Sequence, residues 1–269
     1  MITLIVAVSA GLGVFAAACF AADWGVGWSI FSGVVSFAAV QGVAGFILQR
    51  RVRRDMDVVQ GILVEGQKKL QAKMQRWQVR PPGSLQAAQK EMFEDTKTFV
   101  RAALRETERL SKYRLWVPMV ERQKATAQLQ LSWMIKDFDT VDRLMPRALV
   151  LEPTMAAIKM ARMYMTGADT AEIAKVYAKG IRRLRYNQNV LLAATWSWIL
   201  VKRGDADGAF KVLTEALKNS DDATLKRNHE ALMNNRTTHF SNSGIGEQWY
   251  SLLLEEPRVR MQRQHPVYR

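Results

Sequence analysis

The stretch KRGDADGAFKVLTEALKNSDD, from Lys202 to Asp222, has the pattern of a tight turn followed by an amphipathic helix. Gly204 and Asp205 supply the turn, and the polar run that begins at Asn219 ends the helix. One face of this helix carries small or apolar residues at the spacing of helical turns, namely Ala209, Leu213 and Ala216. The stretch therefore predicts the second half of a helical hairpin, and its period decides whether that hairpin is repeated.

A second stretch of the same kind lies 68 residues earlier, where Lys136 to Pro153 reads KDFDTVDRLMPRALVLEP. The matching pairs are Asp137 with Asp205, Val141 with Ala209, Met145 with Leu213, Ala148 with Ala216, and Pro153 with Asp221. Because 68 is twice 34, a middle copy is expected between them, with its second helix at Thr170 to Arg185. The spacing predicts three helix-turn-helix units of about 34 residues each.

This pattern resembles the tetratricopeptide repeat family over roughly Glu121 to Asp222. The third copy keeps the family's turn and its two small residues, but has Leu213 in place of an aromatic side chain. The first copy has Lys136 in place of the turn glycine, and Pro146 is expected to kink its second helix. The resemblance implies an all-α fold with a short α-solenoid, and the alternative is an unrelated helical bundle.

The resemblance also implies a groove lined by the first helix of each unit, where a partner protein would bind. Aromatic side chains often dominate such binding, although a Trp at helical spacing can equally belong to the core. The predicted groove residues are Gln123, Thr126, Gln130 and Trp133 from the first unit, Lys159 and Met163 from the second, and Trp198 and Lys202 from the third.

Residues 1–49 differ sharply in composition from the rest of the chain, because Asp23 is their only charged residue. Two apolar runs, Met1 to Ala22 and about Gly25 to Leu48, are each long enough to span a bilayer as a helix. A cleaved signal peptide followed by one span is the alternative. Small residues recur every four positions in both runs, at Ser9, Gly13, Ala17 and Ala21 and at Gly25, Ser29 and Gly33, which favours close packing of the two spans on each other or between copies of the chain.

Residues 50–269 carry all 39 basic residues and 24 of the 25 acidic ones, a net charge of +15. Basic residues at the exit of the second span, and none between the spans, predict that both termini face the cytoplasm of a bacterial inner membrane. Trp24 and Trp28 suit the opposite interface. The residues expected to contact anionic lipid headgroups are Arg50, Arg51, Arg53 and Arg54.

Between the membrane hairpin and the repeats, residues 50–117 are predicted to form a helical stalk. A helix continuing from the second span to Gln78 has a weak coiled-coil pattern, for which packing against the next helix is the alternative. Ser84 is placed to cap a second long helix from Leu85 to Tyr113, and Pro118 is placed to open the next helix. The expected domains are thus a transmembrane hairpin (1–49), the stalk (50–117), the repeats (118–222), capping helices (223–257) and a basic tail (258–269).

The sequence predicts no catalytic, metal or cofactor site. The three histidines have no metal-ligand spacing, and Cys19 is the only cysteine. The sequence therefore favours a membrane-anchored adaptor or scaffold for partner proteins. Lipid binding is expected as well, homo-oligomers are possible, and nucleic-acid binding is not expected. The alternatives are a HemY-type membrane protein associated with haem synthesis, on layout alone, and a self-assembling structural membrane protein.

Overall fold

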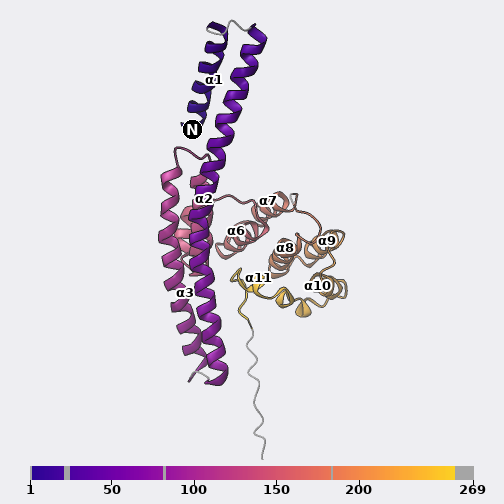
Figure 1. Ribbon diagram of the computed structural model, residues 1–269. Helices are drawn as coiled ribbons and strands as arrows, with labels where there is room; N and C mark the ends of the chain where they lie inside the picture. The colour runs from indigo at the N-terminus through magenta and orange to yellow at the C-terminus, as the bar shows by residue number, and fades with distance from the viewer. Residues whose placement is uncertain (1, 21–24, 81–82, 183, 258–269) are drawn as a thin grey trace, which may run out of the picture. The chain divides into compact units, whose positions relative to one another are not determined.

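The computed structural model of the chain describes residues 2–20, 25–80, 83–182 and 184–257, and every regular element in those ranges is a helix (Figure 1). The prediction of an all-α fold is therefore confirmed. The chain divides into two compact units, Met1–Leu149 and Val150–Arg269. This boundary falls inside the predicted repeat region, so that the first predicted repeat belongs to the same unit as the apolar hairpin. Trp24 and the predicted basic tail lie outside the described residues.

The first unit begins with two helices that are long and apolar enough to cross a membrane, α1 (Ile2–Phe20) and α2 (Val26–Val79). Only 22% of the apolar stretch of α1 and 6% of that of α2 is buried inside the protein. A core helix of a soluble protein would bury most of such a surface. The exposed apolar surface is what a lipid-facing hairpin requires.

The two apolar helices approach each other closely where two glycines face each other. A Cβ atom on Gly11 would lie 2.9 Å from the Gly33 carbonyl oxygen, and one on Gly33 would lie 2.9 Å from the Gly11 carbonyl oxygen. The small residues of α2 thus face α1, as expected. On α1, however, Gly13 faces open space, and the buried residues are Thr3, Ala7, Gly11 and Ala18. The predicted small-residue row of α1 points away from the helix pair.

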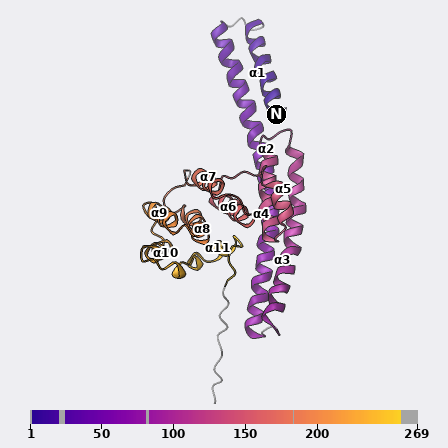
Figure 2. The ribbon, with the colours of Figure 1, turned by 180° about the vertical axis from the view of Figure 1, so that it is seen from behind.

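Helix α2 continues without a break from the apolar stretch into the charged part of the chain. Helix α3 (Leu85–Thr107) then returns beside it, and a 3₁₀ helix, η1 (Glu108–Tyr113), follows (Figure 2). The Ser84 side chain caps α3 by accepting a 3.1 Å hydrogen bond from the Ala87 N–H. Val59 of α2 packs with Val100 and Ala103 of α3, so α2 uses its apolar positions inside this chain.

Helices α4 (Val120–Met134) and α5 (Phe138–Leu144) complete the first unit. The expectation that Pro118 opens the helix is wrong by two residues: Pro118 lies in the preceding turn, and Met119 adopts a left-handed conformation with φ of 67° before α4 starts. Helix α5 has only seven residues and ends at Leu144, two residues before Pro146. Proline has no N–H to donate to a helical hydrogen bond, and its ring disfavours the helical conformation of the residue before it.

The second unit contains five helices of eleven to thirteen residues, α6 (Pro153–Met165), α7 (Thr170–Ile181), α8 (Val190–Lys202), α9 (Ala206–Leu217) and α10 (Ala223–Met233). Each contacts the next in order, and α6 also packs on α8. Two 3₁₀ turns, η2 (Thr237–His239) and η3 (Ser243–Ile245), and the short helix α11 (Glu247–Tyr250) follow. Helix α11 is shorter than the predicted Glu247–Leu254 helix.

The same helix-ending turn occurs after α4, α6, α8 and α10. A residue with positive φ donates its N–H to the carbonyl three residues back, and the next residue donates to the carbonyl five back, which defines a Schellman turn. The four left-handed residues are Lys136 (59°), Gly167 (75°), Gly204 (83°) and Asn235 (54°). The chain therefore reverses in one way four times, although two of the four residues are not glycine.

We expect the Lys136→Gly substitution to raise the free energy of unfolding by about 0.5–1 kcal/mol, because relief of the left-handed strain exceeds the entropy that glycine adds to the unfolded chain. The matched Gly204→Ala substitution should lower it by about 1 kcal/mol, since it puts a Cβ where glycine sits at φ 83°. Thermal unfolding in detergent measures both. Equal signs for the two changes would contradict the shared turn geometry.

Candidate functional site

The predicted groove residues of the first unit lie on α4. Gln123 is exposed, whereas Trp133 is only 2% exposed and its ring packs edge-on against Phe138 at 5.5 Å. Thr126 and Gln130 are half-buried. The Thr126 hydroxyl accepts the Leu149 N–H at 2.8 Å and donates to the Arg122 carbonyl. On α4, therefore, Gln123 is exposed, whereas Trp133 and Thr126 make contacts within the protein.

The predicted groove residues of the second and third repeats lie on α6 and α8, in the second compact unit. Lys159 and Met163 are half-buried on α6 and Lys202 is exposed on α8. Trp198 is 5% exposed, and its ring contacts Tyr164 of α6 edge-on at 5.3 Å. The Lys202 ammonium lies 5.3 Å from the centre of the Trp198 ring. The rings of Trp133 and Trp198 are thus both buried and packed on other aromatic rings, as expected for core residues.

The C-terminal segment covers Trp198. The indole N–H of Trp198 donates to one carboxylate oxygen of Glu255 at 2.8 Å, and the indole N–H of Trp249 donates to the other at 2.9 Å. The two rings meet edge-on at 5.7 Å. One carboxylate thus satisfies two buried donors and fastens the chain end to α8. This pairing is not predictable from local sequence patterns, because Glu255 lies 57 residues from Trp198.

Two buried asparagines fasten the loop before α11 to the same helix. The Asn228 amide donates to the Asn242 side-chain oxygen at 2.7 Å, and the Asn242 amide donates to the Ala194 carbonyl at 2.9 Å. The Asn228 oxygen accepts the Ser241 N–H. Buried polar groups that are fully bonded fix one arrangement of a loop. The polar loop at 237–246 is therefore an ordered part of the second unit.

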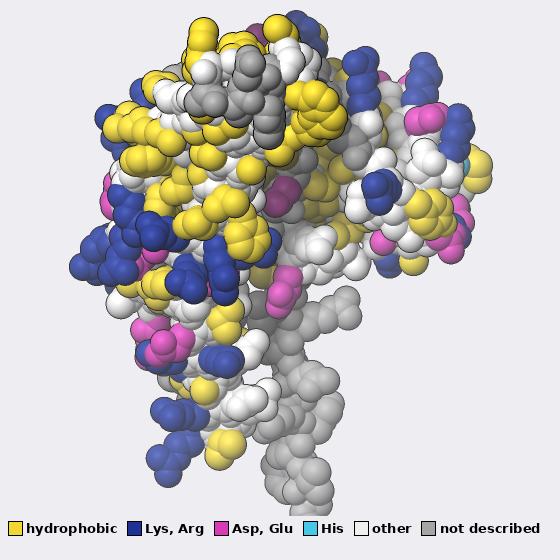
Figure 3. Space-filling view, turned by 45° about the horizontal axis from the view of Figure 1, so that its top comes forward, with side chains coloured by type: hydrophobic (Ala, Val, Ile, Leu, Met, Phe, Trp, Pro, Cys, Tyr) yellow, Lys and Arg dark blue, Asp and Glu magenta, His cyan; other side chains and the backbone are white. Residues whose placement is uncertain are grey.

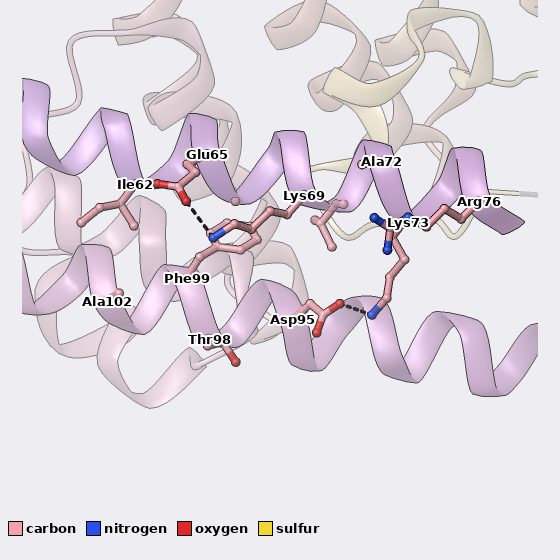
Figure 4. Close-up of a pocket in the computed structure, with 12 residues that line it drawn as sticks. Ile62, Glu65, Lys69, Ala72, Lys73, Arg76, Asp95, Thr98, Phe99 and Ala102 are labelled. Atoms are coloured by element: carbon pink, nitrogen blue, oxygen red, sulfur yellow. Dashed lines mark hydrogen bonds and ion pairs between the residues drawn. The ribbon is translucent and has the colours of Figure 1, made fainter.

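A cavity of about 540 Å³ lies between α2 and α3 in the first unit (Figure 4). Gly66 makes room for the Phe99 ring, because a Cβ there would lie 2.4 Å from the ring. Ile62 adds to the apolar lining, and Lys73 forms ion pairs across the cavity with Glu91 at 2.6 Å and with Asp95. The lining combines apolar side chains with the charged side chains of Glu65, Lys69, Lys73, Arg76 and Asp95, and its residues include no histidine or cysteine. Apolar and charged side chains thus meet at one cavity between the two helices.

A second ionic contact joins η1 to α2 at the end of the apolar stretch. The Lys112 ammonium lies 2.8 Å from the Asp55 carboxylate. Burial alone would raise the pKa of Asp55, but hydrogen bonds from Lys112 and Tyr113 outweigh it and hold that pKa below its usual value. Tyr113 also packs with Val52, Leu110 and Val120. The contact fixes η1 and the start of α4 on α2.

Because the folded-state pKa of Asp55 is depressed, the stability that this contact adds is present above about pH 4 and is lost as the pH falls through the folded-state value. We therefore expect Asp55→Asn to lower stability at pH 7 and to make the difference between pH 7 and about pH 3 smaller. Asp57→Asn, an exposed change on the same helix, is the control. Urea unfolding at both pH values measures the difference, and equal acid sensitivity in Asp55→Asn and the wild type would contradict the assignment.

The four arginines predicted to contact lipid are all exposed on α2, directly after the apolar stretch. Hydrophobic side chains gather over the end of the hairpin nearest the viewer, and Lys and Arg side chains follow below it (Figure 3). In the described ranges, no three His, Cys, Asp or Glu side chains come together as metal ligands. The candidate site is therefore a surface and not a pocket. Along α2 it consists of an exposed apolar stretch followed by exposed arginines.

No family model, no curated protein and no solved structure matches this chain.

Proposed function

We propose that the protein is a membrane-anchored helical adaptor, which holds partner proteins at the cytoplasmic face of a bacterial inner membrane through tetratricopeptide-like helix pairs. The observation that carries the proposal is the continuity of α2, whose first half is apolar and exposed and whose second half packs into a charged helical unit. Because one continuous helix forms both parts, the charged part of α2 and the helix α3 packed on it stay attached to the apolar hairpin.

The tetratricopeptide-like arrangement is supported by three helix pairs, α4 with α5, α6 with α7 and α8 with α9, each joined by the same Schellman turn. Asp137 and Asp205 cap the second helices of the first and third pairs with side-chain hydrogen bonds to N–H groups three residues on. The exposed positions of the first helices, Gln123 and Lys202, are where a partner would be contacted.

The test is photo-crosslinking of the full-length protein in its native membrane. A photoreactive residue at Gln123, Lys159 or Lys202 should give one discrete adduct, identified by mass spectrometry. The same residue at Lys211, exposed on α9, or at Lys218, exposed directly after α9, should not give it. Adducts that are absent at all five positions, or identical at all five, would count against an adaptor that binds through its first helices.

A further inference from the structure

We infer that residues 114–119, Arg-Leu-Trp-Val-Pro-Met, form an interfacial wedge that inserts into the lipid headgroup layer beside the base of the hairpin. This inference rests on the proposed membrane anchor and adds to it a third contact, far along the sequence from the two spans. Lipid is the partner that covers this segment.

The wedge is hydrogen-bonded to the first turn of α1. The Ile2 N–H donates to the Leu115 carbonyl at 3.0 Å, and the Thr3 hydroxyl donates to the Trp116 carbonyl at 3.3 Å. Helix starts leave backbone donors without partners, and here the wedge satisfies one of them. A loop bonded to the end of a membrane helix must lie at the same depth as that end.

The depth follows from the packing of the hairpin. Gly11 lies against Gly33 and Phe37 in an antiparallel helix pair. Ile2, nine residues before Gly11, is therefore level with the residues nine further along α2, between Gly42 and Phe46. This is the last turn or so of the apolar stretch, which the arginines follow.

Three of the four large apolar side chains of the wedge are exposed. Leu115 is 55% exposed, Trp116 40% and Met119 60%, whereas Val117 packs on the cluster around Val52. In the described part of the chain beyond Leu48, no other five consecutive residues expose three large apolar side chains. In water, three neighbouring exposed apolar side chains favour aggregation, whereas in the headgroup layer their burial stabilises the protein.

The wedge also has the composition of a membrane interface. Trp116 carries an amphipathic ring of the kind that prefers the headgroup level, and Arg114 is exposed next to it. Trp28, 69% exposed, lies at the other end of the apolar stretch. From Trp28 to Phe46 the helix rises about 27 Å, which is close to the hydrocarbon thickness of about 30 Å. The two tryptophans thus lie one bilayer thickness apart.

The experiment measures depth with a fluorophore on single cysteines in the full-length Cys19→Ser protein, reconstituted in vesicles of phosphatidylcholine and phosphatidylglycerol. The probe replaces Met119, Leu115, Leu12 in the middle of α1, or Val79 at the far end of α2. Quenching is compared between lipids that carry a nitroxide near the headgroup and lipids that carry one deep in the acyl chain.

We expect the probes at Met119 and Leu115 to be quenched about two- to threefold more by the shallow nitroxide than by the deep one, as interfacial side chains are. The Leu12 probe should show the reverse order, and the Val79 probe should be quenched by neither. Deep quenching at Leu12 with none at Met119 and Leu115 would overturn the wedge and leave the anchor standing. Loss of quenching at Leu12 as well would remove the anchor, and the wedge with it. Probes at Met119 and Leu115 that are shielded from both nitroxides and from aqueous iodide would show a protein surface over the segment, which also overturns the inference.

Discussion

Replacing Glu255 by alanine is expected to lower the free energy of unfolding of the second unit by about 2–4 kcal/mol. The reason is that two indole N–H groups, of Trp198 and Trp249, lose their acceptor together, and a buried donor without a partner costs about 1–3 kcal/mol. Trp249 is fully buried and Trp198 nearly so, which leaves water little room to replace the carboxylate. Urea unfolding followed by tryptophan fluorescence measures the loss.

Glu256→Ala is the matched control, since Glu256 is the exposed neighbour of Glu255 and carries the same charge. It should change the stability by less than about 0.5 kcal/mol, as surface substitutions do. Glu255→Gln should fall between the two, because the amide keeps one acceptor oxygen. Comparable losses in Glu255→Ala and Glu256→Ala would show that charge, and not the two hydrogen bonds, stabilises this segment.

The second large effect is expected at Gly66 of α2. A methyl group there would meet the Phe99 ring at 2.4–2.7 Å, so Gly66→Ala must displace a ring that is held between two helices. Overpacking of this kind costs about 1–3 kcal/mol. Helical propensity recovers about 1 kcal/mol of that at most. Thermal unfolding should therefore show a net loss of stability.

Gly61→Ala, five residues earlier on the same helix, supplies the contrast. A Cβ at Gly61 meets nothing within 4 Å, so only helical propensity acts, and the substitution should stabilise α2 by up to about 1 kcal/mol. Opposite signs at the two glycines are the expected result. If both substitutions stabilise the protein, α3 does not pack on α2 as described.

The helical framework is largely predictable from the sequence because its signals are local. No proline interrupts Arg50 to Gln78, and α2 runs through that stretch. Ser84 precedes a helical pattern and does cap α3. The turn at Gly204 is visible as a glycine. At Lys136 only the repeat spacing marks the turn position, because a lysine does not by itself indicate a left-handed conformation.

The long-range contacts are not predictable in the same way. The bonds from α1 to Leu115 and Trp116 join residues more than one hundred positions apart, and nothing near either end indicates the other. The same holds for Glu255. Its neighbour Glu256 is the same residue type but is exposed, and nothing in the local sequence indicates which of the two accepts from the indoles. The tryptophans predicted for the groove show most clearly what helical spacing cannot distinguish. A Trp that binds a partner and a Trp that packs inside the protein, as Trp198 does on Tyr164, have the same spacing in the sequence.

The central claim is that α1 and α2 form a membrane hairpin that keeps the rest of the chain on one side. The most direct measurement is the labelling of single cysteines in intact cells with a membrane-impermeant maleimide, in the Cys19→Ser protein. Cysteine at Gly25, between the two apolar helices, should react from outside, and cysteine at Lys218 should react only after the membrane is opened. Reaction of both positions from the same side, or release of the protein by an alkaline wash, would contradict the account.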